Sequence, residues 1–137
     1  NDTLYYLKGE DADKLIKPAQ NIHYDYSSYN DYCIITRTNA KLIHLLNKND
    51  DLRPVRHPRN FFDPIIDIFK EKIPVLNDYE NFQGYLDELE VVAQKTDDVE
   101  LISSVALVRE HRDINFFMRL YDKAIRNRRR RSLNTYI

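Results

Sequence analysis

The order of hydrophobic and polar residues changes along this chain, from strand-like near its start to helix-like in its middle. A continuous apolar run at residues 32–36 predicts a strand that is covered on both faces. β-Prone segments predict further strands at residues 3–8, 21–26 and 133–137. The polar stretch from Asn47 to Arg59, which contains two prolines, predicts a loop.

Between the strands, apolar residues recur three or four positions apart, as on one face of a helix. These stripes predict helices over residues 40–48, 60–69, 82–93, 101–108 and 116–124. Acidic residues precede the last three stripes and are expected to cap those helices: Asp78, then Asp97 or Asp98, then Asp113.

This order predicts an α/β fold with a helical majority. A small β-layer, with one strand near residues 32–36 and others at the β-prone segments, would carry an inserted bundle of about four helices. The length of 137 residues suits one compact unit. The chain has a single cysteine, Cys33, and neither a signal-like start nor an apolar run of membrane-spanning length, so we expect an intracellular protein of the cytoplasm or nucleus.

The net charge of −1 is an average over the chain and does not show that basic residues are concentrated in one segment. Five of the six residues from Arg126 to Arg131 are arginine. Such a ridge binds nucleic-acid phosphates by releasing counterions, largely without sequence preference. The residues predicted to bind nucleic acid are Arg119, Lys123, Arg126, Arg128, Arg129, Arg130 and Arg131. The alternatives are a solvated tail that neutralises the acidic residues between Asp87 and Glu100, and a nuclear-localisation-like patch.

The most specific local pattern is Arg37-Thr38-Asn39-Ala40, directly after the strand predicted at residues 32–36. An arginine held between a strand and the N-terminus of a helix is well placed to meet a phosphate. These residues resemble motif IV of the UvrD-type superfamily 1 DNA helicases, in which R-T-N-A follows a strand. The helical stretches after them resemble the insertion found in the F-box DNA helicases.

The resemblance implies that residues 1–48 belong to the second RecA-like domain of a helicase, that 49–131 form its helical insertion, and that 132–137 begin the return strand of motif V. It also implies that Arg37 has a catalytic contact with the γ-phosphate of ATP, with Thr38 and Asn39 as nucleotide-binding neighbours. From the residues alone, Thr38 and Asn39 are good helix N-caps, and Arg37 could pair with a local carboxylate.

No complete ATPase is expected on this chain, because it lacks the G-K-T phosphate loop and most other helicase motifs. ATP and Mg would be cofactors of the parent enzyme only. The missing initial methionine indicates a fragment, and a stand-alone relative without the motor is the other interpretation.

We therefore expect part of an ATP-dependent DNA helicase of the DNA-repair type. Its expected partners are single-stranded or forked DNA, the remainder of the helicase and a partner protein. The alternatives are a small non-enzymatic nucleic-acid-binding protein that uses the arginines and a protein-interaction module whose acidic helices bind a partner.

Other residue types give weaker signals. The histidines lack metal-ligand spacing, so we expect no zinc site from His23, His44, His57 and His111. The tyrosines between residues 24 and 32 could stack bases, but packing explains their spacing better.

Overall fold

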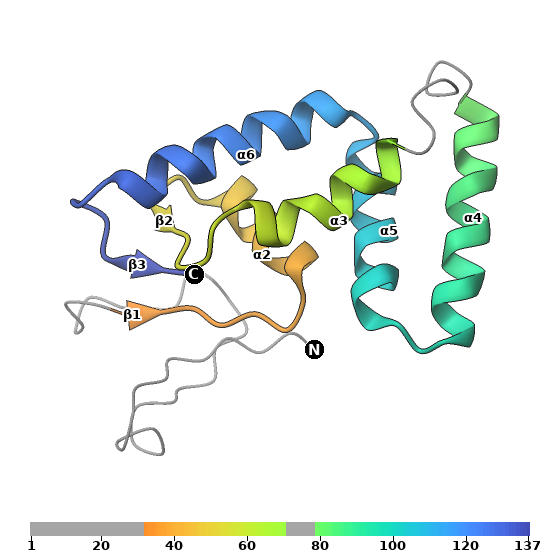
Figure 1. The fold of residues 1–137 in the computed structure, drawn as a ribbon, viewed down its shortest axis with the longest axis horizontal. Coiled ribbons are helices and arrows are strands. Elements are labelled where there is room, and N and C mark those ends of the chain that lie inside the picture. The colour runs from red at the N-terminus through yellow and green to blue at the C-terminus, as the bar shows by residue number, and fades with distance from the viewer. Residues whose placement is uncertain (1–31, 71–78) are drawn as a thin grey trace.

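Helices make up most of the described part of the chain and pack beside a small parallel sheet (Figure 1). The computed structural model describes residues 32–70 and 79–137. The helices are α2 (Asn39–Lys48), α3 (Arg59–Lys70), α4 (Tyr79–Lys95), α5 (Val99–His111) and α6 (Ile114–Arg129). The strands are β1 (Tyr32–Cys33), β2 (Leu52–Arg53) and β3 (Thr135–Tyr136). The predicted helical majority is confirmed.

The described strands run parallel in the order β1-β3-β2, so the last strand lies in the centre. Tyr136 of β3 is the register partner of Cys33 in β1 and of Arg53 in β2. The chain therefore returns after α6 to place β3 between β1 and β2. Strands are present within the predicted segments 32–36 and 133–137, although both are short. The strands predicted at 3–8 and 21–26 lie outside the described residues.

The loop predicted from Asn47 to Arg59 is wrong in its middle, where β2 forms. The C-terminal residue supplies the partners: Ile137 donates its N–H to Arg53 O at 3.0 Å and accepts the N–H of Val55 at 2.9 Å. These hydrogen-bond partners are distant from β2 in sequence. Because β2 has only two residues and lies beside a proline, it also shows no alternation of apolar and polar residues from which a strand could be predicted.

Side-chain caps fix the starts of three helices. Thr38 caps α2, Asp98 caps α5 and Asp113 caps α6, each accepting a first-turn backbone N–H at 2.9–3.2 Å. Such bonds satisfy amides that have no partner within the helix. The predicted caps at Asp98 and Asp113 are confirmed, whereas Asp78 lies outside the described residues.

Aromatic side chains form the centre of the hydrophobic core. Phe61, Phe69 and Phe117 have no exposed surface. The ring of Phe69 in α3 lies 5.6 Å from Phe117 of α6 and 5.7 Å from Phe82 of α4. Burying each such side chain stabilises the fold by about 1.5–3 kcal/mol. The same cluster includes Ile34, next to β1, so sheet and helices share one core.

Helix α2 packs against α3, α5 and α6, whereas α4 lies at the edge and packs mainly against α5 (Figure 1). Arg109 of α5 fastens this edge helix. Its guanidinium donates to Gln83 Oε1 at 2.7 Å and Glu90 Oε2 at 2.9 Å, and also to Asp87. The carboxylates of Asp87, foremost, and Glu90 raise the pKa of Arg109.

Candidate nucleic-acid interface

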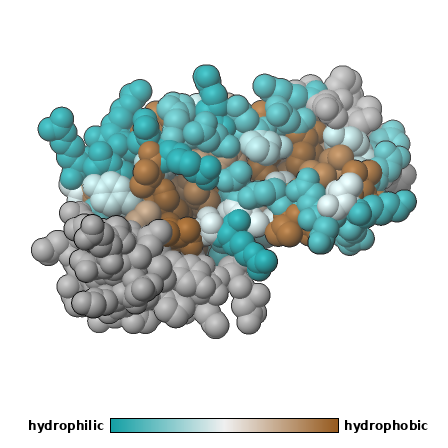
Figure 2. Space-filling view, turned by 60° about the horizontal axis from the view of Figure 1, so that its bottom comes forward, coloured by the Kyte–Doolittle hydropathy of each residue, from teal (hydrophilic) through white to brown (hydrophobic). Residues whose placement is uncertain are grey.

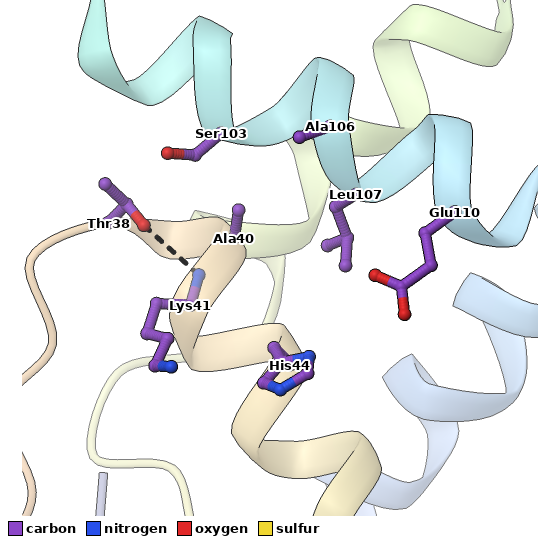
Figure 3. A pocket seen from close by; sticks show the side chains of 8 residues that line it. All are labelled: Thr38, Ala40, Lys41, His44, Ser103, Ala106, Leu107 and Glu110. Carbon is purple, nitrogen blue, oxygen red and sulfur yellow. Dashed lines mark hydrogen bonds between the residues drawn. The ribbon is translucent and has the colours of Figure 1, made fainter. Parts of the chain in front are cut away.

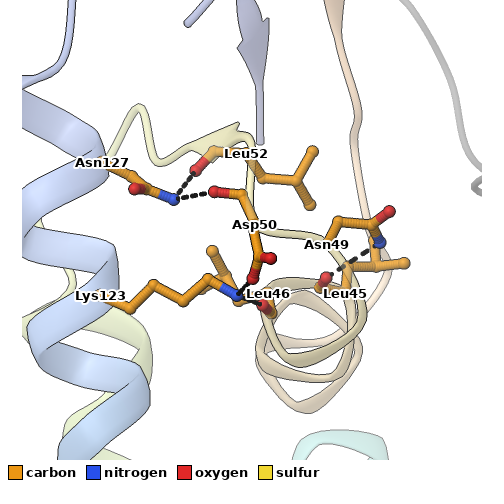
Figure 4. Close-up of polar contacts among 7 residues, drawn as sticks. All are labelled: Leu45, Leu46, Asn49, Asp50, Leu52, Lys123 and Asn127. Carbon is orange, nitrogen blue, oxygen red and sulfur yellow. Dashed lines mark hydrogen bonds and ion pairs between the residues drawn. The ribbon is translucent and has the colours of Figure 1, made fainter.

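The end of α6 is fastened to the segment between α2 and β2 (Figure 4). Lys123 Nζ donates to Leu46 O and to Asp50 Oδ1, both at 2.6 Å. Asn127 Nδ2 donates to Asp50 O at 2.8 Å and to Leu52 O at 3.0 Å. Residues four apart lie on the same side of a helix, so Lys123 and Asn127 lie together on α6 and both of their side chains make contacts that stabilise the fold.

Lys123, one of the predicted nucleic-acid-binding residues, is thereby held apart from the arginines. Its side chain is only 17% exposed, and its ammonium group is bound to Leu46 and Asp50. The hydrogen bond from Lys123 and then its charge lower the pKa of the Asp50 carboxyl. The structure therefore gives Lys123 a structural contact that its sequence context does not indicate.

The arginines at the other predicted positions are exposed. We call this set the arginine ridge: Arg119, Arg126, Arg128, Arg129, Arg130 and Arg131. No ridge side chain forms a hydrogen bond or ion pair with another residue in the described ranges. Figure 2 shows hydrophilic side chains projecting at the end of the molecule where α6 runs towards β3. One acidic residue, Asp122, is also exposed on this part of α6.

The ridge continues beyond α6 into the turn before β3. Arg130 is the C-cap residue of α6, and its backbone N–H donates to Asn127 O at 3.1 Å. Leu133 is buried and holds the turn against the fold. Cations in the last helical turn also stabilise the helix dipole, but that effect fades beyond the helix end. It therefore accounts for Arg128 and Arg129 better than for Arg131.

The residues predicted to bind nucleotide lie at the N-terminus of α2. Arg37 is exposed, and its side chain has no partner among the described residues. Thr38 is buried and uses its hydroxyl oxygen for the cap. The backbone N–H of Asn39 donates to both carboxylate oxygens of Glu100 at 3.1 Å, and Asn39 Oδ1 accepts from Arg56 at 2.9 Å.

An anion position at this helix N-terminus is thus filled by a carboxylate of the chain itself. Glu100 lies 61 residues from Asn39, and no local pattern marks the contact. Of the three predicted nucleotide-binding residues, Arg37 alone offers an unengaged charged side chain to a phosphate.

Arg37 and the arginine ridge lie at opposite ends of the parallel strands of the small sheet. Arg37 follows the carboxyl end of β1, whereas the ridge precedes the amino end of β3. Because β1 and β3 are parallel neighbours, these two ends point in opposite directions (Figure 1). The predicted nucleotide and nucleic-acid residues therefore form two regions and not one.

An open groove of about 280 Å³ lies between α2 and α5 (Figure 3). Lys41 and His44 line it from α2, and Ser103 and Glu110 from α5. Burial and, next, the charge of Lys41 lower the pKa of His44, which favours the neutral form of its imidazole. Thr38, at one end, is the one predicted site residue in its lining.

No group of three or more His, Cys, Asp or Glu side chains suited to a metal ion occurs in residues 32–70 and 79–137. None of the helices described here is both long and apolar enough to cross a membrane. Comparison of the chain with protein-family models, curated proteins and solved structures finds no match. A functional assignment therefore rests on the residues themselves.

Proposed function

We propose that this chain is part of an ATP-dependent, UvrD-type DNA helicase and that it binds DNA phosphates through the arginine ridge. The observation that carries the binding proposal is the density of exposed arginines whose side chains form no ion pair in the described part of the chain. The motor's phosphate loop would be supplied by other parts of the parent enzyme.

The ridge suits a phosphate backbone for physical reasons. Each guanidinium offers several N–H donors in a planar fork that matches phosphate oxygens. Neutralising successive phosphates releases condensed counterions, which favours binding and makes the affinity fall as salt rises. Because Lys123 and Asn127 anchor α6 to the rest of the fold, the ridge arginines are presented on a fixed support.

The helicase part of the proposal is supported by the order of the elements. The R-T-N-A segment follows β1, and the chain returns after α6 to place β3 beside β1. Helices α3 to α6 would be the inserted bundle, and Arg37 would contact the γ-phosphate of ATP bound by the parent enzyme. The ATP and its Mg²⁺ supply the phosphoryl chemistry, and the role of this chain is to hold one guanidinium at the end of β1.

A protein-interaction role is the second candidate, and α4 favours it. This edge helix leaves Val91 and Val92 exposed at 47% and 52%. Exposed apolar side chains on a helix that contacts mainly one neighbour can bind another protein. This role is compatible with DNA binding at the opposite end of the molecule (Figure 1).

A titration with labelled oligonucleotides tests the binding proposal. The wild type is titrated with single-stranded and forked DNA at about 50 mM and about 200 mM salt. The DNA affinity should fall between these salt concentrations, and it should fall more steeply the more phosphates the protein contacts. The test variant carries Arg128→Glu, Arg130→Glu and Arg131→Glu. The matched control carries Arg59→Glu, Lys70→Glu and Lys95→Glu, which are exposed and change the net charge equally.

We expect salt-dependent binding that the ridge variant loses and the control largely keeps. Equal losses in both variants would mean that overall charge, and not the ridge, causes binding. No binding at low salt would refute the proposal for this chain and favour protein docking. The gene tests the helicase assignment separately: a G-K-T loop encoded upstream in frame, and an H-x-A-K-G segment directly after Ile137, are expected.

A further inference from the structure

One arginine beside the ridge differs from the rest because its position is fixed. Arg53 lies in β2 and is only partly exposed. Its Nε donates to Arg128 O at 3.1 Å, which ties it to the ridge. Its guanidinium carbon also lies 5.5 Å from the centre of the Tyr136 ring. A cation over an aromatic face is stabilised by the electrons of the ring.

The sheet register explains this pairing. Arg53 and Tyr136 are direct partners in the parallel β2–β3 pair, so their side chains lie on the same face of the sheet. Leu52 and Ile137, which neighbour them in sequence, are buried and lie on the other face, against the core. The core thus orients Arg53 and Tyr136 outwards.

The guanidinium of Arg53 keeps unused binding capacity. Its terminal nitrogens make no hydrogen bond or ion pair with any residue of the described ranges. Two contacts, one to Arg128 O and one to the Tyr136 ring, fix the plane of the guanidinium. A planar cation with a fixed orientation suits stacking, because little conformational freedom is lost when a flat ligand lies on it.

We propose that Arg53 and Tyr136 form a stacking platform for an unpaired nucleobase beside the arginine ridge. This inference rests on the proposed nucleic-acid binding and adds to it a preference for single strands. The ridge holds phosphates of any strand, but only a base released from a duplex can lie on a guanidinium or tyrosine plane. Arg53 is thus the residue that distinguishes single-stranded from double-stranded DNA.

Abasic oligonucleotides separate stacking from phosphate binding. A single strand of about 16 nucleotides is compared with a duplex of the same sequence and with an abasic strand that keeps every phosphate. We expect the wild type to bind the base-bearing strand at least about tenfold more tightly than the abasic strand. Arg53→Lys keeps the charge but removes the plane, and it should abolish this preference. Arg59→Lys, at an exposed position away from the sheet, should leave it unchanged.

A second variant reports stacking directly. The chain contains no tryptophan, so Tyr136→Trp provides a unique fluorophore. We expect its fluorescence to be quenched by the base-bearing strand and not by the abasic strand. If the wild type binds both strands equally, or if both strands quench the introduced indole to the same extent, the platform is refuted while phosphate binding stands. If no strand binds at low salt, the proposed function itself fails.

Discussion

The carboxylate of Glu100, near the start of α5, accepts the backbone N–H of Asn39, the first residue of α2, with both oxygens at 3.1 Å. A negative charge at this position stabilises α2, because the helix N-terminus carries a partial positive charge and unpaired amides. The contact also fixes α5 against α2, with which it shares the groove of Figure 3.

Removing this carboxylate should therefore weaken the fold. We expect Glu100→Ala to lower the free energy of unfolding by about 0.5–1 kcal/mol, and Glu100→Gln to lower it less because the amide oxygen can still accept one hydrogen bond. Urea unfolding measures both. Glu88→Ala is the control, since Glu88 is exposed on α4. Equal effects at both positions would show that the Asn39 contact contributes nothing.

The buried amide of Asn127 makes a larger contribution. It is 3% exposed and donates to Asp50 O and Leu52 O. Asn127→Leu leaves these carbonyl groups without their donor, so we expect a loss of about 2 kcal/mol or more in the free energy of unfolding. Asn115→Leu, at an exposed position in the first turn of α6, should cost much less. A small loss for Asn127→Leu would mean that water replaces the amide.

These two contacts show what local sequence can and cannot predict here. The caps at Asp98 and Asp113 were predictable because a cap acts within one turn of its own helix. The contacts of Glu100 and Asn127 join residues 61 and 75 or more positions apart, so they depend on how the helices pack. Strand β2 could not be predicted from the local sequence for the same reason, since the distant residue Ile137 supplies its hydrogen bonds.

In the candidate interface, too, some features could be predicted from the sequence and others depend on how the chain packs. A run of arginines is evident in any sequence, and their exposure follows from charge. Lys123 has the same charge and similar spacing, yet Asp50 and Leu46 take its ammonium. The fixed geometry of Arg53 depends on Tyr136, which is a neighbour only after the chain has returned to the sheet.

Asp97 offers a test of backbone strain. It has φ of 55°, in the left-handed region, at the end of α4. The N–H of Asp98 donates to Ala93 O at 2.8 Å and that of Asp97 to Gln94 O at 3.3 Å, which is the pattern of a helix end that favours glycine. We expect Asp97→Gly to raise the free energy of unfolding by about 0.5 kcal/mol and Asp97→Ala to lower it. Thermal unfolding of both variants checks the order, and a more stable alanine variant would contradict it.

The ion pair of Asp50 with Lys123 should make stability depend on pH in acid. The pKa of Asp50 is lowered in the folded protein, so the stabilisation is present above the unfolded pKa and is lost as pH falls through the folded pKa. We expect the free energy of unfolding to fall more for the wild type than for Asp50→Asn between about pH 6 and about pH 2. Parallel curves for the two proteins would show that the pair contributes no pH dependence. Asp63→Asn, at an exposed position of α3, serves as the control.

The attachment of α4 depends on Arg109, which contacts Gln83, Asp87 and Glu90. Because its side chain is 28% exposed, solvent weakens each ion pair, and the network as a whole should contribute about 1 kcal/mol. We expect Arg109→Ala to make amide hydrogens of α4 exchange about fivefold faster, with those of α6 unchanged, since α4 packs mainly against α5. Arg119→Ala, which removes an arginine without a partner in the described residues, should change neither helix. Faster exchange throughout the protein would instead mean that Arg109 stabilises the whole fold and that α4 does not open on its own.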